Sequence, residues 1–195
     1  MPLTPLDLPG ADAAVDPTWL SPDEASALFD ALYTGIAWEK HRIRLFGREV
    51  DSPRLSCWIG DPGARYTYSG TRFEPRPWPQ ALLPTRARLR AEFDVDFNSV
   101  LANLYRDGRD RMGWHADNER ELGAFPVIAS LSLGATRRFV FRHRFEPSLK
   151  RELRLGHGSL LVMAGETQAN HRHALPATSR SVGPRINLTF RRITA

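Results

Sequence analysis

The segment NLYRDGRDRMGWHADNE spans residues 103–119 and ends in a His-x-Asp pair, His115 and Asp117. Residues i and i+2 of an extended backbone point to the same side, so this imidazole and this carboxylate would converge on one point. One more histidine would complete a two-His-one-carboxylate triad, which leaves coordination positions open on a non-haem Fe(II) ion. A charged pair on a surface loop is the alternative, because His-x-Asp tripeptides also occur by chance.

Two polar residues at the start of the same segment, Asn103 and Tyr105, are also two positions apart and would share one face of a strand. The charged, glycine-containing link at residues 106–113 predicts a loop between this strand and the His-x-Asp pair.

The final strand predicted, residues 185–193, alternates between two kinds of side chain. Its polar positions, which would share one face, are Arg185, Asn187, Thr189 and Arg191. A solvent-exposed polar face is the ordinary explanation of such a pattern. However, arginines six residues apart are separated by about 20 Å on a flat strand. With twist and long side chains, both could grip the two ends of one small dicarboxylate.

Histidines 171 and 173 lie between these segments, in the sequence NHRHALP at residues 170–176. A single histidine is more often structural or exposed than a metal ligand. Taken alone, neither residue identifies the third ligand.

Composition limits the class of protein. The chain has 195 residues and is 42% hydrophobic with ten Phe and five Trp, which is enough to fill the core of one domain covering residues 1–195. No run approaches the ~18 apolar residues that would cross a bilayer, and the N-terminus does not look like a secretory signal. Cys57 is the only cysteine, which excludes an internal disulfide framework and thiolate metal cages. We therefore expect a cytoplasmic protein without membrane contact, and a monomer.

The net charge of +5 points to a polyanion partner such as nucleic acid. The basic residues are almost all arginine, since Lys40 and Lys150 are the only lysines. An arginine-rich composition that only reflects a GC-rich coding sequence is the alternative.

The order of predicted elements indicates a mainly β (α+β) fold. Residues 1–20 are expected to form an irregular arm. Residues 21–96 should form helices and hairpins, with a helix that starts at a capping box of Ser21 and Glu24 and ends near Tyr33, and a second helix at 80–93. From about residue 97 onward the pattern is a β core, with short strands that argue for an antiparallel sandwich or barrel. These strands are predicted at 98–105, 127–134, 137–144, 150–155, 159–164 and 185–193.

Taken together, Asn-x-Tyr, His-x-Asp, a distal histidine and Arg-x-Asn-x-Thr-x-Arg resemble, in order and spacing, the AlkB family of Fe(II)- and 2-oxoglutarate-dependent dioxygenases. The resemblance is to the nucleic-acid demethylase branch and extends over about residues 38 to 193. It includes the segments YRDG (105–108), EREL (119–122), PVIAS (126–130), FVFRH (139–143) and GSLL (158–161).

This resemblance implies a double-stranded β-helix (jelly-roll) core and a set of site residues. It implies that iron is held by His115, Asp117 and His173, with His173 rather than His171 selected by its spacing to Arg185. Arg185 would hold the distal carboxylate of 2-oxoglutarate, and Arg191 would lie near the carboxylate that chelates the metal. Further hydrogen bonds would come from Asn103, Tyr105, Asn187 and Thr189.

The resemblance also implies the reaction, with Fe(II), 2-oxoglutarate and dioxygen as cofactor and co-substrates. Decarboxylation of 2-oxoglutarate to succinate would be coupled to hydroxylation of an N-methyl group on an alkylated base, such as 1-methyladenine or 3-methylcytosine, in DNA or RNA. Loss of formaldehyde would then restore the base.

The residues expected to contact the substrate lie in three places. A hairpin carrying Phe46, Gly47 and Arg48 would lie beside the nucleic acid, with Phe46 as a wedge in the base stack. Tyr66 and Tyr68 would form a pocket wall suited to a cationic lesion, while Asn118 and Glu119 would contact the exocyclic amine of the base. Core packing is the alternative for the aromatic residues. Asn118 replaces an acidic residue of the family, which leaves the preferred lesion open.

Two other functions fit the same residues. An oxygenase of this fold could act on a protein or a small molecule. A nucleic-acid-binding module without catalysis would need a defective metal site, whereas all three ligands and both arginines are present.

Overall fold

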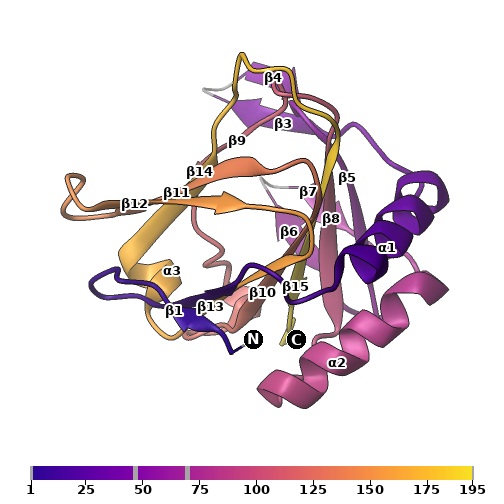
Figure 1. Cartoon of the computed structure of the whole chain (residues 1–195), viewed down its shortest axis with the longest axis horizontal. Coiled ribbons are helices and arrows are strands. Elements are labelled where there is room, and N and C mark those ends of the chain that lie inside the picture. Colours follow the sequence, from indigo (N-terminus) through magenta and orange to yellow (C-terminus); the bar gives the residue numbers. More distant parts are fainter. Residues whose placement is uncertain (1, 46–47, 69–70, 195) are drawn as a thin grey trace.

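The computed structural model describes residues 2–45, 48–68 and 71–194, except for the side chains of residues 43–49 and 66–73. Two antiparallel sheets face each other (Figure 1). The larger sheet has the strand order β1 (Thr4–Pro5), β2 (Asp12–Asp16), β13 (Ser159–Ala164), β10 (Ile128–Gly134), β15 (Arg185–Arg191), β8 (Ser99–Tyr105) and β5 (Leu55–Gly60). The smaller sheet has the order β12 (Lys150–Leu155), β11 (Arg137–His143), β14 (His171–Leu175) and β9 (Met112–His115). The predicted mainly β architecture is confirmed.

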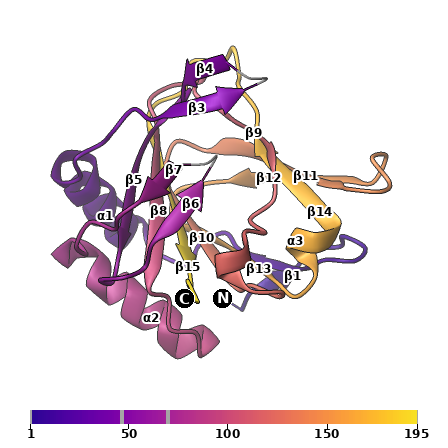
Figure 2. The same cartoon turned by 180° about the vertical axis from the view of Figure 1, so that it is seen from behind.

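Two small hairpins lie beside these sheets, as Figure 2 shows from behind. They pair β3 (Arg42–Leu45) with β4 (Arg48–Asp51), and β6 (Tyr66–Tyr68) with β7 (Thr71–Phe73). The remaining elements are helical: α1 (Pro22–Gly35), η1 (Gln80–Leu82), α2 (Leu83–Phe93), η2 (Arg120–Leu122) and α3 (Thr167–Asn170). None of the described helices combines the length and the apolar character of a membrane-spanning segment.

Helix α1 begins where the sequence predicts, at a capping box. The Ser21 hydroxyl accepts a hydrogen bond from the Glu24 amide, and the Ser21 amide donates to the Glu24 carboxylate. These bonds satisfy amide groups that have no partner within the helix. The apolar stripe of α1, which includes Leu28 and Leu32, is buried.

Strand β15 is buried on both faces and lies between two of the three apolar clusters of the described residues. Ile186, Leu188 and Phe190 point toward α1 and α2 and belong to one apolar cluster with Leu28, Leu32 and Leu89. The opposite face of β15 looks into the space between the sheets, where Phe139 and Phe141 belong to a second cluster. The polar alternation of this strand therefore lines an interior space, and the explanation as a solvent-exposed face is wrong.

The predicted irregular arm at residues 1–20 is wrong in part, because it contains β1 and β2. Strand β2 extends the larger sheet by pairing with β13, with Val15 opposite Leu161. The side chains of Ala13 and Asp16 on this strand are buried. The sequence in this region lacks a strong apolar alternation, so its conformation comes from the free edge of β13 rather than from local preference.

Two further strands were not predicted. The loop predicted at residues 106–113 stops earlier, because β9 already begins at Met112. Residues 171–175 form β14, between β11 and β9. Both strands are short and contain glycine, histidine or arginine, so their pairing partners determine their conformation.

Candidate metal and 2-oxoglutarate site

Three potential metal ligands converge at one end of the space between the sheets. His115 ends β9, Asp117 follows it by two residues, and His173 lies on β14. Their ligand atoms all lie within 4.8 Å of one another. His173 and His115 are directly opposite in the β14–β9 pair, with ring centroids 4.2 Å apart. The register of this strand pair therefore places the two imidazoles next to each other.

Neighbouring groups fix the orientation of both imidazoles. The Phe139 ring stacks on His173 with a centroid distance of 5.3 Å. Nδ1 of His115 lies 2.9 Å from the Gly113 carbonyl oxygen. A carbonyl can only accept, so Nδ1 carries the proton and Nε2 keeps its lone pair for a metal.

The electrostatic environment favours the protonation states that metal binding requires. Burial by itself would raise the pKa of Asp117, but the charge and the hydrogen bond of Arg191 act against it, and the pKa lies below its usual value. Arg191 donates to Asp117 Oδ1 over 2.6 Å. Burial lowers the pKa of His115, and it lowers the pKa of His173 to about 3. Near neutral pH the site therefore offers two neutral imidazoles and one carboxylate. This donor set fits Fe(II).

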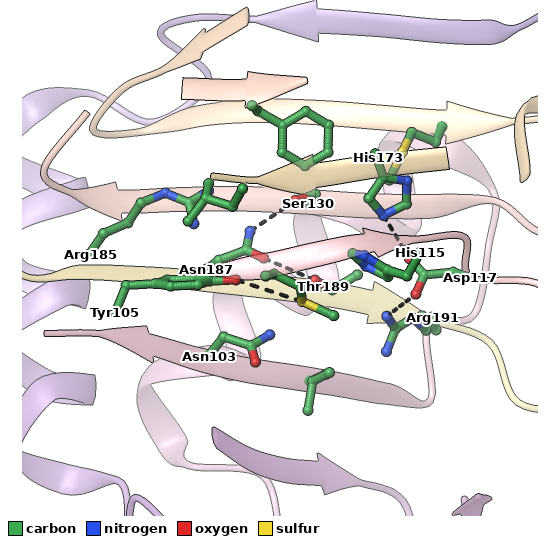
Figure 3. Close-up of a pocket in the computed structure, with 15 residues that line it drawn as sticks. Asn103, Tyr105, His115, Asp117, Ser130, His173, Arg185, Asn187, Thr189 and Arg191 are labelled. Atoms are coloured by element: carbon green, nitrogen blue, oxygen red, sulfur yellow. Dashed lines mark hydrogen bonds and ion pairs between the residues drawn. The ribbon is translucent and has the colours of Figure 1, made fainter. Parts of the chain in front are cut away.

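A second charged group lies at the far end of the same pocket (Figure 3). The Arg185 side chain is buried, and its Nη2 donates to the Ser132 hydroxyl over 2.9 Å. Its Nε and Nη1 have no hydrogen-bond partner among the described residues. Burial lowers the pKa of Arg185 to about 10, so the guanidinium is still a cation near neutral pH.

This buried cation needs an anion. No carboxylate in the described part of the chain forms a salt bridge with Arg185, and an unpaired buried charge is strongly unfavourable. The ring of Tyr105 lies 5.3 Å from the guanidinium carbon. A small carboxylate that enters the pocket would supply the partner that Nε and Nη1 lack, so the arrangement fits the distal end of 2-oxoglutarate.

Asn187 and Thr189 lie between the two charged ends, whereas Tyr105 lies at the Arg185 end, as Figure 3 shows. The Asn187 side-chain amide donates to the Ser130 hydroxyl over 2.9 Å, and the Thr189 hydroxyl donates to the side-chain oxygen Oδ1 of Asn187 over 3.1 Å. Asn103 lies opposite Asn187 in the β8–β15 pair. The structure thus brings all the predicted metal and 2-oxoglutarate residues to one pocket.

Two residues of this site were not predicted from the sequence. Gln168 on α3 is buried, and its Oε1 accepts a hydrogen bond of 2.9 Å from the backbone amide of Asp117. The buried Arg54 donates from Nε to the Asn103 side-chain oxygen over 2.7 Å. Neither contact follows from spacing in the sequence, because each joins elements that are 49 or more residues apart.

His171 is also buried on β14, but it lies outside the triad. Its nearest aromatic partner in this region is His143, with ring centroids 5.0 Å apart. The two histidines of β14 therefore have different surroundings, and only His173 meets His115 and Asp117.

The residues predicted to contact substrate are only partly described. Asn118 is exposed and Glu119 is half-buried, directly after the triad residue Asp117. Phe46 and Gly47 lie outside the described residues. Arg48 is part of β4, and Tyr66 and Tyr68 are part of β6, but their side chains also lie outside that description. Their roles stay predictions.

Comparison with known proteins identifies similar sequences and folds. The family model described as the 2OG-Fe(II) oxygenase superfamily matches residues 12–191. The DNA oxidative demethylase ALKBH2 of Bos taurus is 43% identical over 159 residues, which cover 78% of this chain and 57% of that protein. The alpha-ketoglutarate-dependent dioxygenase alkB homolog 3 of Bos taurus is 38% identical over 186 residues, which cover 91% of this chain and 64% of that protein. This chain thus matches about six tenths of the length of these relatives.

Two solved structures share the fold at low sequence identity. OsALKBH1 has a TM-score of 0.63 and 16% identity, and the match covers 98% of this chain and all of that one. A prolyl-4-hydroxylase of Pseudomonas putida has a TM-score of 0.61 and 18% identity, with 94% of both chains covered. These similarities concern the fold alone.

The two buried histidines of β14 provide a matched test of the metal site. We expect Mn(II) to raise the melting temperature of the native protein and of His171→Gln, because ligand binding stabilises the folded state. His173→Gln should lose this increase, since one of three ligands is removed. Thermal unfolding of each protein with and without Mn(II) measures this increase in melting temperature. An equal loss in both variants would contradict the assignment of His173.

The contact between Gln168 and Asp117 predicts a role in positioning a metal ligand. Gln168→Leu removes the acceptor and should weaken Mn(II) binding roughly tenfold or more, as typical for groups that orient metal ligands. Gln168→Glu keeps an acceptor at the same place and should retain more of the affinity. Calorimetric titration of Mn(II) compares the two variants, and equal affinities in both would count against this role.

Proposed function

Because this chain belongs to the 2OG-Fe(II) oxygenase superfamily and, as its sequence predicted, to the AlkB-type dioxygenases within it, we propose that it demethylates alkylated bases of nucleic acid oxidatively. The proposed substrates are N-methylated bases such as 1-methyladenine and 3-methylcytosine in DNA, and the same lesions in RNA. The observation that carries the proposal is the single pocket with a His/Asp/His group at one end and an unpaired buried arginine at the other.

In this proposal, the residues of the chain hold both ends of 2-oxoglutarate. His115, Asp117 and His173 would hold Fe(II). Arg185 would bind the distal carboxylate with its free donors Nε and Nη1. Arg191, which already donates to Asp117, would lie beside the end that binds the metal.

When bound, Fe(II), 2-oxoglutarate and dioxygen would supply the oxidative chemistry, in which decarboxylation of 2-oxoglutarate to succinate and carbon dioxide is coupled to hydroxylation of the N-methyl carbon, and the hydroxymethyl product loses formaldehyde. The chain contributes orientation and exclusion of water. Apolar side chains, which include Leu101, Met112 and Phe139, line the pocket together with the polar residues and would displace water when the ligand is bound. Charge interactions are stronger in such surroundings than in water.

The substrate side of the proposal rests on sequence. Phe46 would act as a wedge, and Tyr68 would stack on the flipped base. Asn118 and Glu119 follow the metal ligand Asp117 directly and would meet the exocyclic amine. As a neutral residue, Asn118 would make the site less selective for a cationic lesion than an acidic residue would. We also propose that the protein acts as a monomer in the cytoplasm.

A methylated oligonucleotide tests this function. With Fe(II), ascorbate, dioxygen and 2-oxoglutarate, an oligonucleotide that contains 1-methyladenine or 3-methylcytosine should release formaldehyde, and an equal amount of 2-oxoglutarate should be converted to succinate. Asp117→Ala should abolish both products. Turnover of 2-oxoglutarate that no methylated oligonucleotide stimulates would contradict the proposal and point to a protein or a small molecule as substrate.

A further inference from the structure

The outer face of the smaller sheet carries a concentration of positive charge. Phe139 and Phe141 of β11 point inward to the core, so the alternate residues of this strand point away from the pocket. Residues directly opposite on neighbouring strands share a face. The charged side chains of this outer face are Arg138, Arg142, Lys150, Glu152, Arg154 and Arg172. The face thus holds five cations and one carboxylate.

The cations of this outer face lie opposite one another. Arg142 faces Lys150 on β12 and Arg172 on β14, and Arg138 faces Arg154. Like charges in directly opposed positions destabilise a sheet. Glu152 forms an ion pair with Arg138, and the other four cations form no salt bridge with any described residue. Salt bridges among the described residues therefore offset this repulsion only at Arg138.

Arginine-rich composition alone does not account for this arrangement. Elsewhere in the molecule, Arg86 pairs with Asp61, Arg106 with Asp110, and Arg109 with Asp107. On the outer face, by contrast, Arg172, Lys150 and Arg154 are exposed without such a partner. What distinguishes the outer face is that its cations lie directly opposite one another on neighbouring strands, which favours an external anion as their partner.

An exposed aromatic ring completes this outer face. Trp114 lies on the edge strand β9, directly before His115, and is 39% exposed. The Arg142 guanidinium lies 4.4 Å from the centre of its ring. Aromatic rings combined with a line of cations are typical of surfaces that bind single nucleic-acid strands. Because β9 carries His115 on one face and Trp114 on the other, the outer face begins at the strand that forms the metal site.

We propose that the outer face of the smaller sheet binds the phosphate backbone of the nucleic acid whose base enters the pocket, a proposal that rests on the proposed function. The row formed by Lys150, Arg142 and Arg172 crosses three strands and spans about 10 Å. This is roughly the length of three phosphates along one strand of a duplex. Apart from Trp114, the exposed side chains of this face are charged, since Val140 and Ala174 are buried, and such a face suits a polyanionic chain better than a membrane surface.

Salt-dependent binding of an unmodified, single-stranded 20-nucleotide DNA by the Mn(II)-loaded full chain tests this proposal. Each phosphate contact contributes about 0.7 to the slope of log affinity against log salt concentration. The double variant Arg142→Gln/Arg172→Gln should therefore make this negative slope shallower by about 1.4. The control Arg88→Gln/Arg90→Gln removes two cations from α2, which covers the larger sheet, and should leave the slope unchanged. Thermal unfolding verifies that both variants are folded.

Kinetics provide a second measurement. For a methylated 20-nucleotide substrate, Arg142→Gln/Arg172→Gln should raise KM and leave kcat unchanged. For a methylated trinucleotide, which is too short to reach the outer face, the variant should change neither KM nor kcat.

Two results of the binding experiment would overturn the proposal. One is an equal salt-dependence slope in the native protein and in Arg142→Gln/Arg172→Gln, and the other is an equal loss of slope in both double variants. If Arg142→Gln/Arg172→Gln lost binding to phosphatidylserine vesicles but still bound DNA as the native protein does, the proposal would also be overturned, and the outer face would be a membrane-binding surface. Because the binding assay needs no turnover, an absence of demethylation would refute the proposed function and leave the slope comparison valid.

Discussion

A buried ion pair between Asp117 and Arg191 connects the two sheets at the site. Its atoms are 2.6 Å apart, and both side chains are almost completely buried. Taking two charges out of water is costly, and removing one partner of such a pair typically costs 3–5 kcal/mol because the other charge is left uncompensated. The pair therefore holds the loop after β9 to the end of β15. It also keeps the carboxylate ionised next to two neutral imidazoles, which is the state that a metal ion requires.

Strand β15 is the element around which both ends of the pocket are arranged. It lies in the middle of the larger sheet, and its apolar residues pack against α1 and α2. Its polar residues place one guanidinium at each end of the same interior face, Arg191 at the carboxylate ligand and Arg185 beside Tyr105. The distance between the two cations is thus set by a strand that is fixed on both sides by packing. A ligand with two separated acidic groups matches this spacing, and 2-oxoglutarate is such a ligand.

Much of this arrangement follows from sequence, and the exceptions have physical causes. The alternation of residues 185–191 predicts a strand with a polar face, and the Ser21 capping box predicts the start of α1. Alternation also puts His171 and His173 on one face of β14, so it cannot distinguish them. The register with β9 makes the difference, because it places His173 opposite His115. Strand β2 and the contacts of Gln168 and Arg54 depend on partners far away in the chain, for which local preference gives no signal. The substrate roles of Phe46, Tyr66 and Tyr68 are predictions from the sequence.

The central claim is that one dicarboxylate bridges Arg185 and the metal group, and calorimetric titration of 2-oxoglutarate tests it most directly. In the presence of Mn(II), the protein should bind one equivalent of 2-oxoglutarate. Binding should weaken strongly in Arg185→Met, which removes the buried cation but preserves much of the volume, and it should also weaken when Mn(II) is omitted. Unchanged affinity in Arg185→Met, or binding that does not depend on the metal, would contradict the account.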